Sequence, residues 1–542
     1  MPFSRIQFLA SLTTLAMAST SVMAEDPPIT IDGGFFDWLS RPIAWSDPSG
    51  DGGSGVDLLQ LRISDEPNWL QIYFVALSEY DLTENNGLSI LLDTDSDPST
   101  GLQAEGIGAE LRFEFGEREG RFYPTVTSNP NSGIQMWHGD ISLQGAPTVT
   151  SNRFEISMSR NATIDGKPVF PGKTISMVLV DSAGERMPDT GAIQHVFDLV
   201  DPPEAHDVVF DREEPDDIRL LSWNVLNDSP WSSQQSPRFE RIIRAISPDV
   251  LNLQEIYNHS ANQVRNLVTG WLGNNPGGWN IAGNNDCWTV SRYPILHSEG
   301  LSGNLAALLD TTDQLGRTLL VLNAHTPCCS NDEGRQWEID EMMSFLGQVR
   351  AGKHSAIPAD TAVEITGDLN LVGFRQQLIS LIEGDIVNES EFGPDIAPDV
   401  DGSALLDTVP LHTQERLAYT WRNDNSGFWP GRLDVTIISD SVMELGNHYV
   451  VETRYMSEES LDLYGLNSND SSCSDHLALV TDVRCPEPAG ITGDLNGDGR
   501  VDGADMGLLL LSWNTSDPVA DLNGSGTVGG DDLGILLLEW TG

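Results

Sequence analysis

Polar side chains recur directly after apolar runs between residues 218 and 485 of this 542-residue chain. Carboxylates that follow successive strands can form a cup of oxygen ligands for Mg²⁺, which keeps several of its waters in such sites. Histidines and asparagines in the same rim would add proton transfer and hydrogen bonds to phosphate oxygens. Each residue alone has an ordinary structural interpretation, but their order and spacing together predict metal-assisted phosphoryl chemistry. In chain order they are Asn224, Glu255, His325, Asp368, Asn370, Asp434, Asp475 and His476.

Apolar strands that alternate with helical segments are expected to position this set. The run at 218–223 precedes Asn224, and Ser236-Pro237 opens a predicted helix that extends to residue 246. Because side chains at strand ends converge on one rim of a sheet, we expect the polar residues to cluster there. The other predicted strands are residues 250–253, 318–323, 362–365 and 433–438.

Short motifs surround these residues. Leu-Asn-Leu-Gln-Glu ends at Glu255, Thr-Gly-Asp-Leu-Asn contains Asp368 and Asn370, and Ser-Asp-His-Leu contains Asp475 and His476. With these motifs, residues 217–485 resemble the endonuclease/exonuclease/phosphatase superfamily, which includes pancreatic deoxyribonuclease, abasic-site endonucleases, bacterial sphingomyelinases and inositol-phosphate phosphatases. The resemblance implies a four-layer α/β sandwich with two central sheets, as in deoxyribonuclease I.

The resemblance also implies how a metal ion and a phosphate are held. Glu255 would be the main ligand of a catalytic Mg²⁺ or Mn²⁺, while Asn224 and Asp475 would lie on the metal side. Asp368 and Asn370 would orient the attacking water and hold the phosphoryl oxygens.

Two histidines would handle protons in the same scheme. His476 would be the general base, polarised by Asp434, because a neighbouring carboxylate fixes the imidazole tautomer and raises its basicity. His325 would contact the phosphate or protonate the leaving oxygen.

Three functions are compatible with this sequence. The first is a secreted, divalent-metal-dependent phosphodiesterase, with extracellular nucleic acid as its substrate. The second is a sphingomyelinase-like phospholipase, for which Phe428-Trp429-Pro430 is a candidate membrane-contacting loop, although a buried aromatic pair fits the same residues. The third is a non-catalytic binding or scaffold protein. This alternative is disfavoured because no expected catalytic position is occupied by an inert residue.

A duplicated segment ends the chain, with an offset of 27 residues between its copies. In each copy, oxygen-bearing side chains occupy positions one, three, five and twelve of a loop, the spacing that surrounds Ca²⁺, and an apolar helix follows. The second copy carries fewer charges, so we expect weaker binding there. The predicted calcium residues are Asp494, Asn496, Asp498, Arg500 (through its carbonyl), Asp502 and Asp505 in the first loop, and Asp521, Asn523, Ser525, Thr527 and Asp532 in the second.

This loop-plus-helix pair resembles the type I dockerin module over residues 491–542, after a short linker at 486–490. The resemblance implies a small all-α calcium-binding unit that docks onto a cohesin-like partner. Gly503-Ala504 and Gly530-Asp531 stand where partner-reading residues usually lie, so the partner itself is left open.

The N-terminal part combines an export signal with a β-rich module. Arg5, a short apolar run and Val22-Met23-Ala24 fit a signal peptide of residues 1–24, which predicts a secreted protein. Alternating runs separated by turn residues predict an antiparallel β-sandwich over residues 25–205, followed by a linker at 206–216. The sandwich resembles sugar-binding-like modules of secreted bacterial enzymes, and its Asp93-Thr-Asp-Ser-Asp97 turn is either a calcium loop or a solvated turn.

Five cysteines all fall in the second half of the chain: Cys287, Cys328, Cys329, Cys473 and Cys485. An exported protein favours disulfides, and Cys473 with Cys485 would close a loop beside Asp475-His476. Cys287 with one of the vicinal pair is a second candidate, and the odd count leaves at least one thiol over. A zinc site built from cysteines is disfavoured, because no two-by-two cysteine spacing exists.

The charge balance excludes a basic binding surface. The chain has 29 Lys and Arg against 81 Asp and Glu, a formal net charge of −52. Residues 218–485 alone hold 16 basic against 36 acidic residues, a formal charge of −20. A basic sheath for nucleic acid or anionic membrane is therefore absent, and any phosphodiester substrate would depend on divalent cations.

Overall fold

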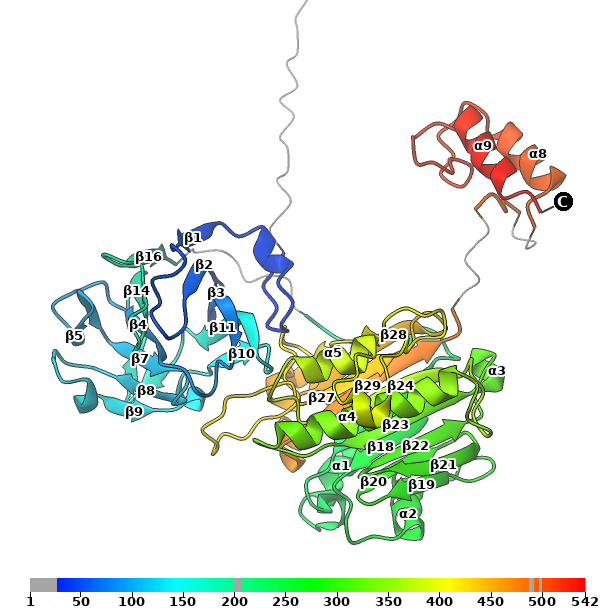
Figure 1. Ribbon diagram of the computed structural model, residues 1–542, viewed down its shortest axis with the longest axis horizontal. Coiled ribbons are helices and arrows are strands. Elements are labelled where there is room, and N and C mark those ends of the chain that lie inside the picture. The colour runs from blue at the N-terminus through cyan, green and yellow to red at the C-terminus, as the bar shows by residue number, and fades with distance from the viewer. Residues whose placement is uncertain (1–26, 198–205, 487–491, 497–499, 542) are drawn as a thin grey trace, which may run out of the picture.

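The computed structural model describes residues 27–197, 206–486, 492–496 and 500–541. Their elements form a β-rich, multi-sheet protein with an α/β core (Figure 1). The predicted signal peptide lies outside the described residues, so export stays a prediction, as do the domain boundaries. No helix in the described ranges is long and apolar enough to cross a membrane.

Two antiparallel sheets lie before residue 198. Their facing sides share one core that includes Leu61, Phe74, Ile90 and Phe113, as expected from runs that alternate between apolar and polar residues. The five-stranded sheet has the order β1 (Ile43–Ser46), β2 (Leu58–Asp65), β3 (Trp69–Tyr80), β11 (Ser151–Ser159), β10 (Gln144–Ala146). The seven-stranded sheet has the order β15 (Arg186–Met187), β14 (Thr174–Asp181), β4 (Leu88–Asp93), β7 (Leu111–Glu114), β8 (Glu119–Phe122), β9 (Ile134–Met136), with β16 (Ile193–Val196) beside β14. Two short hairpins complete this part: β5 (Leu102–Ala104) with β6 (Ile107–Ala109), and β12 (Thr163–Ile164) with β13 (Lys167–Pro168).

Two mixed sheets form the centre of the chain. The first has the order β19 (Asn280–Asn284), β20 (Cys287–Ser291), β18 (Val250–Gln254), β17 (Ile218–Asn224), β29 (Ala478–Arg484), β28 (Glu444–Val451), β26 (Leu411–His412). The second has the order β21 (Ile295–Leu301), β22 (Asn304–Leu309), β23 (Leu319–His325), β24 (Ala362–Asp368), β27 (Asp434–Ile438), β25 (Leu406–Asp407). Every residue of β17 and β24 is buried, because both faces of these strands are covered.

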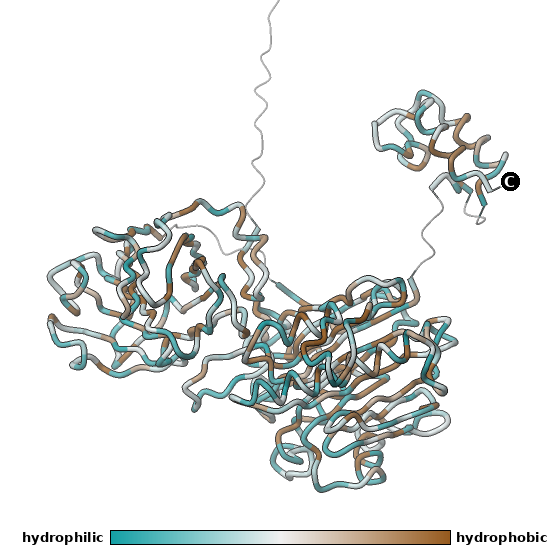
Figure 2. The backbone as a smooth tube through the Cα atoms, in the orientation of Figure 1, coloured by the Kyte–Doolittle hydropathy of each residue, from teal (hydrophilic) through white to brown (hydrophobic). Residues whose placement is uncertain are grey.

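Helices cover the outer face of each central sheet, which gives four layers. On the first sheet, α1 (Ser236–Ile246) and α2 (Ala261–Leu272) bury side chains such as Phe239 against Leu221. On the second, α4 (Asp332–Arg350) and α5 (Gln376–Glu383) pack in the same way. A third cluster, with Leu220 and Val321, fills the space between the sheets, and Figure 2 shows the apolar segments along these strands. The remaining short helices are α3 (Thr312–Leu315), α6 (Glu389–Phe392) and α7 (Glu458–Tyr464).

The N-terminal sheets are packed directly against the central ones. Trp429 is only 5% exposed and lies in the N-terminal core, edge-on to Phe113 and Phe115 at centroid distances of 6.2 and 6.3 Å. The membrane-loop interpretation of this residue is therefore wrong, because its indole is buried between two parts of the same chain. A backbone bridge from Ile31 to Leu417 joins the two parts a second time.

The segment predicted as a linker also contacts the central sheets. Phe210 is buried and stacks on Tyr464 and Tyr449, with ring centroids 4.1 and 4.8 Å apart. The predicted linker at 486–490 lies outside the described residues except for Pro486.

Near the C-terminus, α8 (Gly503–Leu511) and α9 (Gly530–Leu538) share a small core that includes Leu509 and Leu536. The loops before them have matching hydrogen bonds. The Asp505 carboxylate accepts from the backbone N–H of Asn496 (3.1 Å) and of Asp502 (2.8 Å). Asp532 accepts from the backbone N–H of Asn523 (3.1 Å) and of Gly529 (2.6 Å), which are the same positions of the second loop. The predicted ligand Asp498 lies outside the described residues.

The predicted disulfide between Cys473 and Cys485 is wrong, because all five cysteines are free. Cys473 is buried at the end of the 3₁₀ turn Asp470–Cys473, whereas Cys485 is exposed after β29. The seven residues of β29 separate the two, and an extended strand of that length covers roughly 20 Å. A disulfide requires Cα atoms within about 7 Å.

Candidate active site

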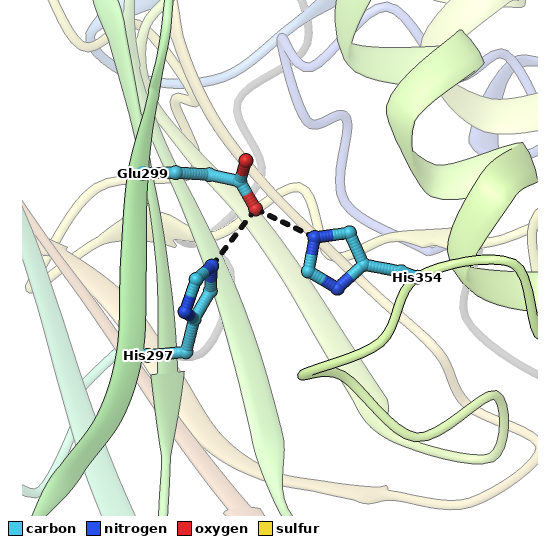
Figure 3. A group of neighbouring side chains, drawn as sticks. All are labelled: His297, Glu299 and His354. Carbon is cyan, nitrogen blue, oxygen red and sulfur yellow. Dashed lines mark hydrogen bonds and ion pairs between the residues drawn. The ribbon is translucent and has the colours of Figure 1, made fainter.

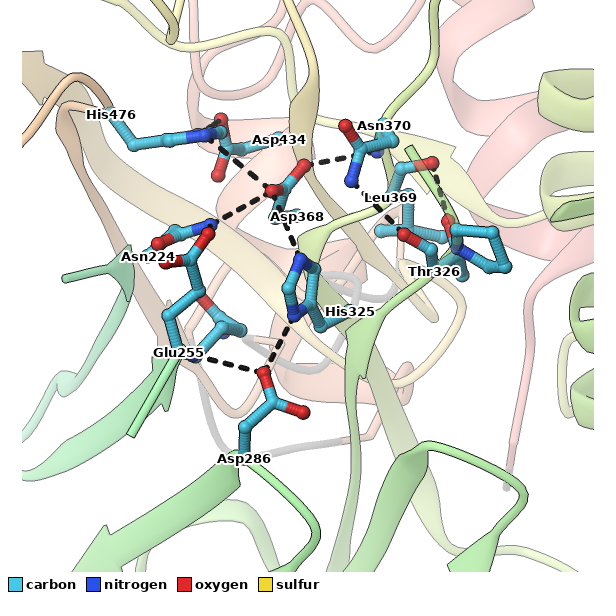
Figure 4. Close-up of polar contacts among 12 residues, drawn as sticks. Asn224, Glu255, Asp286, His325, Thr326, Asp368, Leu369, Asn370, Asp434 and His476 are labelled. Atoms are coloured by element: carbon cyan, nitrogen blue, oxygen red, sulfur yellow. Dashed lines mark hydrogen bonds and ion pairs between the residues drawn. The ribbon is translucent and has the colours of Figure 1, made fainter. Parts of the chain in front are cut away.

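The predicted site residues lie at the strand ends on one edge of the two central sheets (Figure 4). Strand register brings three of them into line, since His325 pairs with Asp368 across β23 and β24, and Asp368 pairs with Asp434 across β24 and β27. In the first sheet, β17 ends at Asn224, and its neighbour β18 ends one residue before Glu255. Strand pairing and sheet packing therefore bring together residues that lie far apart in the sequence.

One carboxylate oxygen of Asp368 is the centre of the cluster. Asn224 Nδ2 donates to Asp368 Oδ2 at 2.9 Å. The Nε2 atoms of His476 and His325 lie 3.5 and 3.6 Å from the same oxygen. Asp368 is 2% exposed, so these contacts are largely shielded from solvent.

Glu255 is held beside this centre by two hydrogen bonds. Asn224 Nδ2 donates to its Oε1 at 3.1 Å, and the backbone N–H of Asn227 donates to its Oε2 at 2.8 Å. Glu255 has a φ of 64°, and three consecutive residues that begin at Leu226 share the left-handed conformation. Left-handed backbone costs non-glycine residues about 1–3 kcal/mol and is concentrated at functional sites. The surrounding structure therefore fixes the direction of this carboxylate.

His476 and Asp434 form a buried pair, with 2.8 Å between Nδ1 and Oδ2. The Thr420 hydroxyl donates to the same Asp434 oxygen at 2.6 Å, while Asp434 Oδ1 is buried without a partner. Burial disfavours the imidazolium, but the charges of Asp434 and Asp368 outweigh this effect and raise the pKa of His476 to about 10. His476 is therefore protonated near neutral pH when these protein groups alone surround it.

His325 is oriented by Asp286, a residue that the sequence patterns did not indicate. Its Nδ1 lies 2.6 Å from Asp286 Oδ2, and the same oxygen accepts from the backbone N–H of Glu255 at 3.1 Å. Burial alone would lower the pKa of His325, but the Asp286 hydrogen bond and the Asp368 charge raise it to about 9. Asp286 stands in the turn between β19 and β20, where an aspartate usually has only a turn-forming role.

Asn370 and Asp475 complete the predicted set. Asn370, with a φ of 48°, donates through Nδ2 to the carbonyl of Thr326 at 3.0 Å and is buried next to Asp368. Asp475 is half-buried and accepts from the indole N–H of Trp421 at 3.3 Å. No described hydrogen bond joins it to Glu255 or Asn224, and its negative charge contributes to the raised pKa of the neighbouring His476.

The donor set fits a hard divalent cation. Glu255 and Asp368 offer carboxylate oxygens, the ligand type that Mg²⁺ and Mn²⁺ prefer, whereas Asn224 turns its Nδ2 toward both carboxylates and its Oδ1 accepts from the backbone N–H of Leu226 at 3.0 Å. The buried Asp434 Oδ1 has no hydrogen-bond partner, and ligand atoms of Asp368, Asp434 and His476 lie within 4.8 Å of one another. This concentration of buried negative charge calls for compensation by cations.

Residues 221–476 match the Endonuclease/Exonuclease/phosphatase family. This part of the chain is therefore a domain of that family, whose members hydrolyse phosphoester bonds and typically use divalent metal ions. No curated protein matches the chain.

Three solved structures illustrate the likeness. Truncated TDP2 from Caenorhabditis elegans is 16% identical, with 50% of this chain and 98% of that chain covered and a TM-score of 0.32. The human Nocturnin catalytic domain with bound sulfate is 15% identical, with 51% and 98% covered and a TM-score of 0.32. ANGEL2, a 2′,3′-cyclic phosphatase in complex with adenosine-2′,3′-vanadate, is 14% identical, with 51% and 99% covered and a TM-score of 0.33.

Proposed function

We propose that the domain at 221–476 is a divalent-metal-dependent phosphodiesterase. The observation that carries this proposal is the convergence of Asn224, His325 and His476 on one oxygen of Asp368, at 2.9, 3.6 and 3.5 Å. Donors aimed at one anionic oxygen inside a buried site are also suited to the non-bridging oxygens of a phosphodiester. Such preorganised donors stabilise the charge that develops in phosphoryl transfer.

The two histidines would divide the proton transfers. His476, held by Asp434 through Nδ1, presents Nε2 toward the cluster and would take the proton of the attacking water once its own proton has left. His325, with Nδ1 on Asp286 and a pKa raised to about 9, is charged near neutral pH and would donate to the phosphate or to the leaving oxygen. Asp368 and Asn370 would position the water and the phosphoryl group.

Glu255 would hold the Mg²⁺ or Mn²⁺, with Asn224 and Asp475 on the same side of the site. The cation would supply charge neutralisation at the phosphate. The fixed Glu255 carboxylate supports this role, because both of its oxygens are already oriented by Asn224 and Asn227.

We propose extracellular nucleic acid as the substrate. The candidate membrane-contacting loop of the phospholipid alternative does not expose Trp429, because that indole is buried. The scaffold alternative, in which this domain is inert, predicts no turnover at all and is therefore an outcome of the same experiment.

The remaining modules are proposed as accessories of a secreted enzyme. The C-terminal loop-plus-helix pair would bind Ca²⁺ and dock a cohesin-like partner, and the matching positions of Asp505 and Asp532 support its duplicated design. The N-terminal sheets would bind carbohydrate. Export would remove residues 1–24, which intact-mass analysis of the secreted protein tests.

A substrate panel tests the catalytic proposal. Purified full-length protein is assayed on DNA, RNA and sphingomyelin, with Mg²⁺, with Mn²⁺ and with a chelator. We expect metal-dependent cleavage of nucleic acid, reduced about 10²- to 10⁴-fold in His476→Asn, because that side chain would transfer a proton in the transition state. His448→Asn is the matched control, since His448 is half-buried on β28 outside the cluster. Turnover that persists in chelator or in His476→Asn would contradict the mechanism, and turnover of sphingomyelin alone would contradict the substrate class.

A further inference from the structure

Two histidines and a glutamate meet at the edge of the second central sheet, apart from the strand ends that carry the candidate active site (Figure 3). His297 and Glu299 lie on the edge strand β21, and His354 lies in the loop after α4. Sequence spacing did not indicate this group, because more than 50 residues separate Glu299 from His354. None of the three has a part in the proposed hydrolysis.

The three ligand atoms are close enough to share a cation. His297 Nε2 lies 3.0 Å from Glu299 Oε1, and His354 Nε2 lies 2.8 Å from the same oxygen. All three atoms lie within 4.8 Å of one another. A tetrahedral Zn²⁺ with bonds of about 2.0–2.2 Å keeps its ligands roughly 3.4 Å apart, so only a small adjustment would admit the ion.

The backbone and the packing aim these side chains at one point. Residues two apart on a strand face the same side, and the pattern of exposure along β21 puts His297 and Glu299 on its half-buried face. The His354 ring packs edge-on against Phe345 of α4, with centroids 5.6 Å apart. Its Nδ1 is buried without a hydrogen-bond partner, so Glu299 is the only described polar contact of this ring.

We propose that His297, Glu299 and His354 form a binding site for Zn²⁺, with solvent in the fourth position. Two imidazoles and one carboxylate form a donor set that suits zinc, whereas Mg²⁺ and Ca²⁺ prefer oxygen ligands only. Side-chain exposures of 32%, 36% and 18% leave the group open to ions from solvent. The bound ion would tie the loop after α4 to the sheet edge, because its ligands come from both elements.

Zinc binding to the full-length protein tests this site directly. Calorimetric titration with Zn²⁺ is carried out in excess Mg²⁺ and Ca²⁺, which occupy the oxygen-rich sites, and Co²⁺ then serves as a spectroscopic probe of nitrogen ligation. We expect one Zn²⁺ per chain, a visible Co²⁺ absorption band, and a melting temperature raised by several degrees, since a ligand of the folded state stabilises it.

Variants separate this site from every other metal site. His297→Asn and Glu299→Gln should each weaken Zn²⁺ binding at least ten-fold and abolish the Zn²⁺-dependent rise in melting temperature. His448→Asn and the active-site variant His476→Asn should keep both. The circular dichroism of each metal-free variant checks its folding, and Glu299→Asp serves as a milder second change. Equal Zn²⁺ binding in wild type and in folded His297→Asn would overturn the proposal, as would loss of that binding in His476→Asn.

Discussion

At the scale of single residues, the carboxylate of Asp368 controls the protonation of both active-site histidines. Its Oδ2 lies 3.5 Å from His476 Nε2 and 3.6 Å from His325 Nε2, and an opposite charge at this distance stabilises an imidazolium. We therefore expect Asp368→Asn to lower the pKa of both rings from about 10 and about 9, each by roughly 1–3 units. NMR titration of the histidine ring protons in the metal-free protein measures the change.

The control for this titration is an exposed carboxylate of α3. Asp313→Asn removes the same charge far from either imidazole in the fold and should leave both pKa values unchanged. If Asp368→Asn moves neither value, Asp368 does not set the charge of the cluster, and the local carboxylates Asp434 and Asp286 must account for it.

Most of the site could be predicted because its residues stand in motifs that follow buried strands. Glu255 and Asp368 come directly after or at the end of apolar runs, so each is expected at a strand end, but their convergence also requires the two central sheets to pack on each other. Asp286 could not be predicted in this way. Its turn sequence reads as an ordinary hairpin, and its link to His325 exists only because β20 packs on β23 of the other sheet.

At the scale of elements, the segment around Trp429 joins the N-terminal sheets to the rim of the active site. The indole fills the core between the N-terminal sheets, while Thr420, a few residues earlier, holds Asp434. Trp429→Ala would leave a cavity in that core, and we expect a loss of about 3–5 kcal/mol in the free energy of unfolding of this part. Urea denaturation followed by tryptophan fluorescence and circular dichroism measures it.

Phe428 provides a matched control for this cavity. It is 37% exposed and stacks under the Arg118 guanidinium at 4.1 Å, so Phe428→Ala should cost less than half as much. Liposome binding should be absent from both variants and from the wild type. If the wild type binds liposomes tightly and Trp429→Ala abolishes that binding, the result would support a membrane-contacting role for Trp429.

Strand β24 carries a buried glutamate between the two central sheets. Burial raises the pKa of Glu364 from 4.5 to about 8, although Asn252 donates to its Oε2 at 3.4 Å. The folded protein therefore keeps Glu364 protonated at pH values where the unfolded chain has lost that proton. Its contribution to stability is full below about pH 4.5 and is lost as the pH rises to about 8.

We expect Glu364→Gln, which stays neutral, to remove this part of the pH dependence. Relative to wild type, the variant should gain about 3–5 kcal/mol of unfolding free energy between pH 5 and 8. Denaturant titrations at several pH values measure the difference. Glu383→Gln changes an exposed carboxylate at the end of α5 and should leave the curve unchanged. A parallel shift at all pH values in Glu364→Gln would mean that Glu364 is not the titrating group.

Element positions follow from the sequence more readily than contacts between them. Runs such as 58–63 and 250–253 are strands because their apolar residues must be covered on one or both faces. The predicted disulfide between Cys473 and Cys485 was wrong because the extended strand between them keeps the two residues apart, although they are close in the sequence. Burial of Trp429 depends on how two separate sheet pairs pack, which no local pattern encodes.

At the scale of the whole molecule, the formal charge of −52 opposes a polyanionic substrate. A basic nuclease loses affinity for DNA as salt rises, because its phosphate contacts release counterions. This protein has the reverse balance, and screening would weaken the repulsion between two negative partners.

The Debye length falls from about 30 Å at 0.01 M salt to about 8 Å at 0.15 M. We therefore expect kcat/KM on DNA to rise about two- to ten-fold over that range at saturating Mg²⁺. A small, singly charged aryl phosphodiester is the matched substrate, and its kcat/KM should stay constant because long-range repulsion hardly affects it. If kcat/KM falls steeply with salt on DNA but not on the small substrate, positively charged residues near the site must attract DNA more strongly than the negative charge of the whole chain repels it.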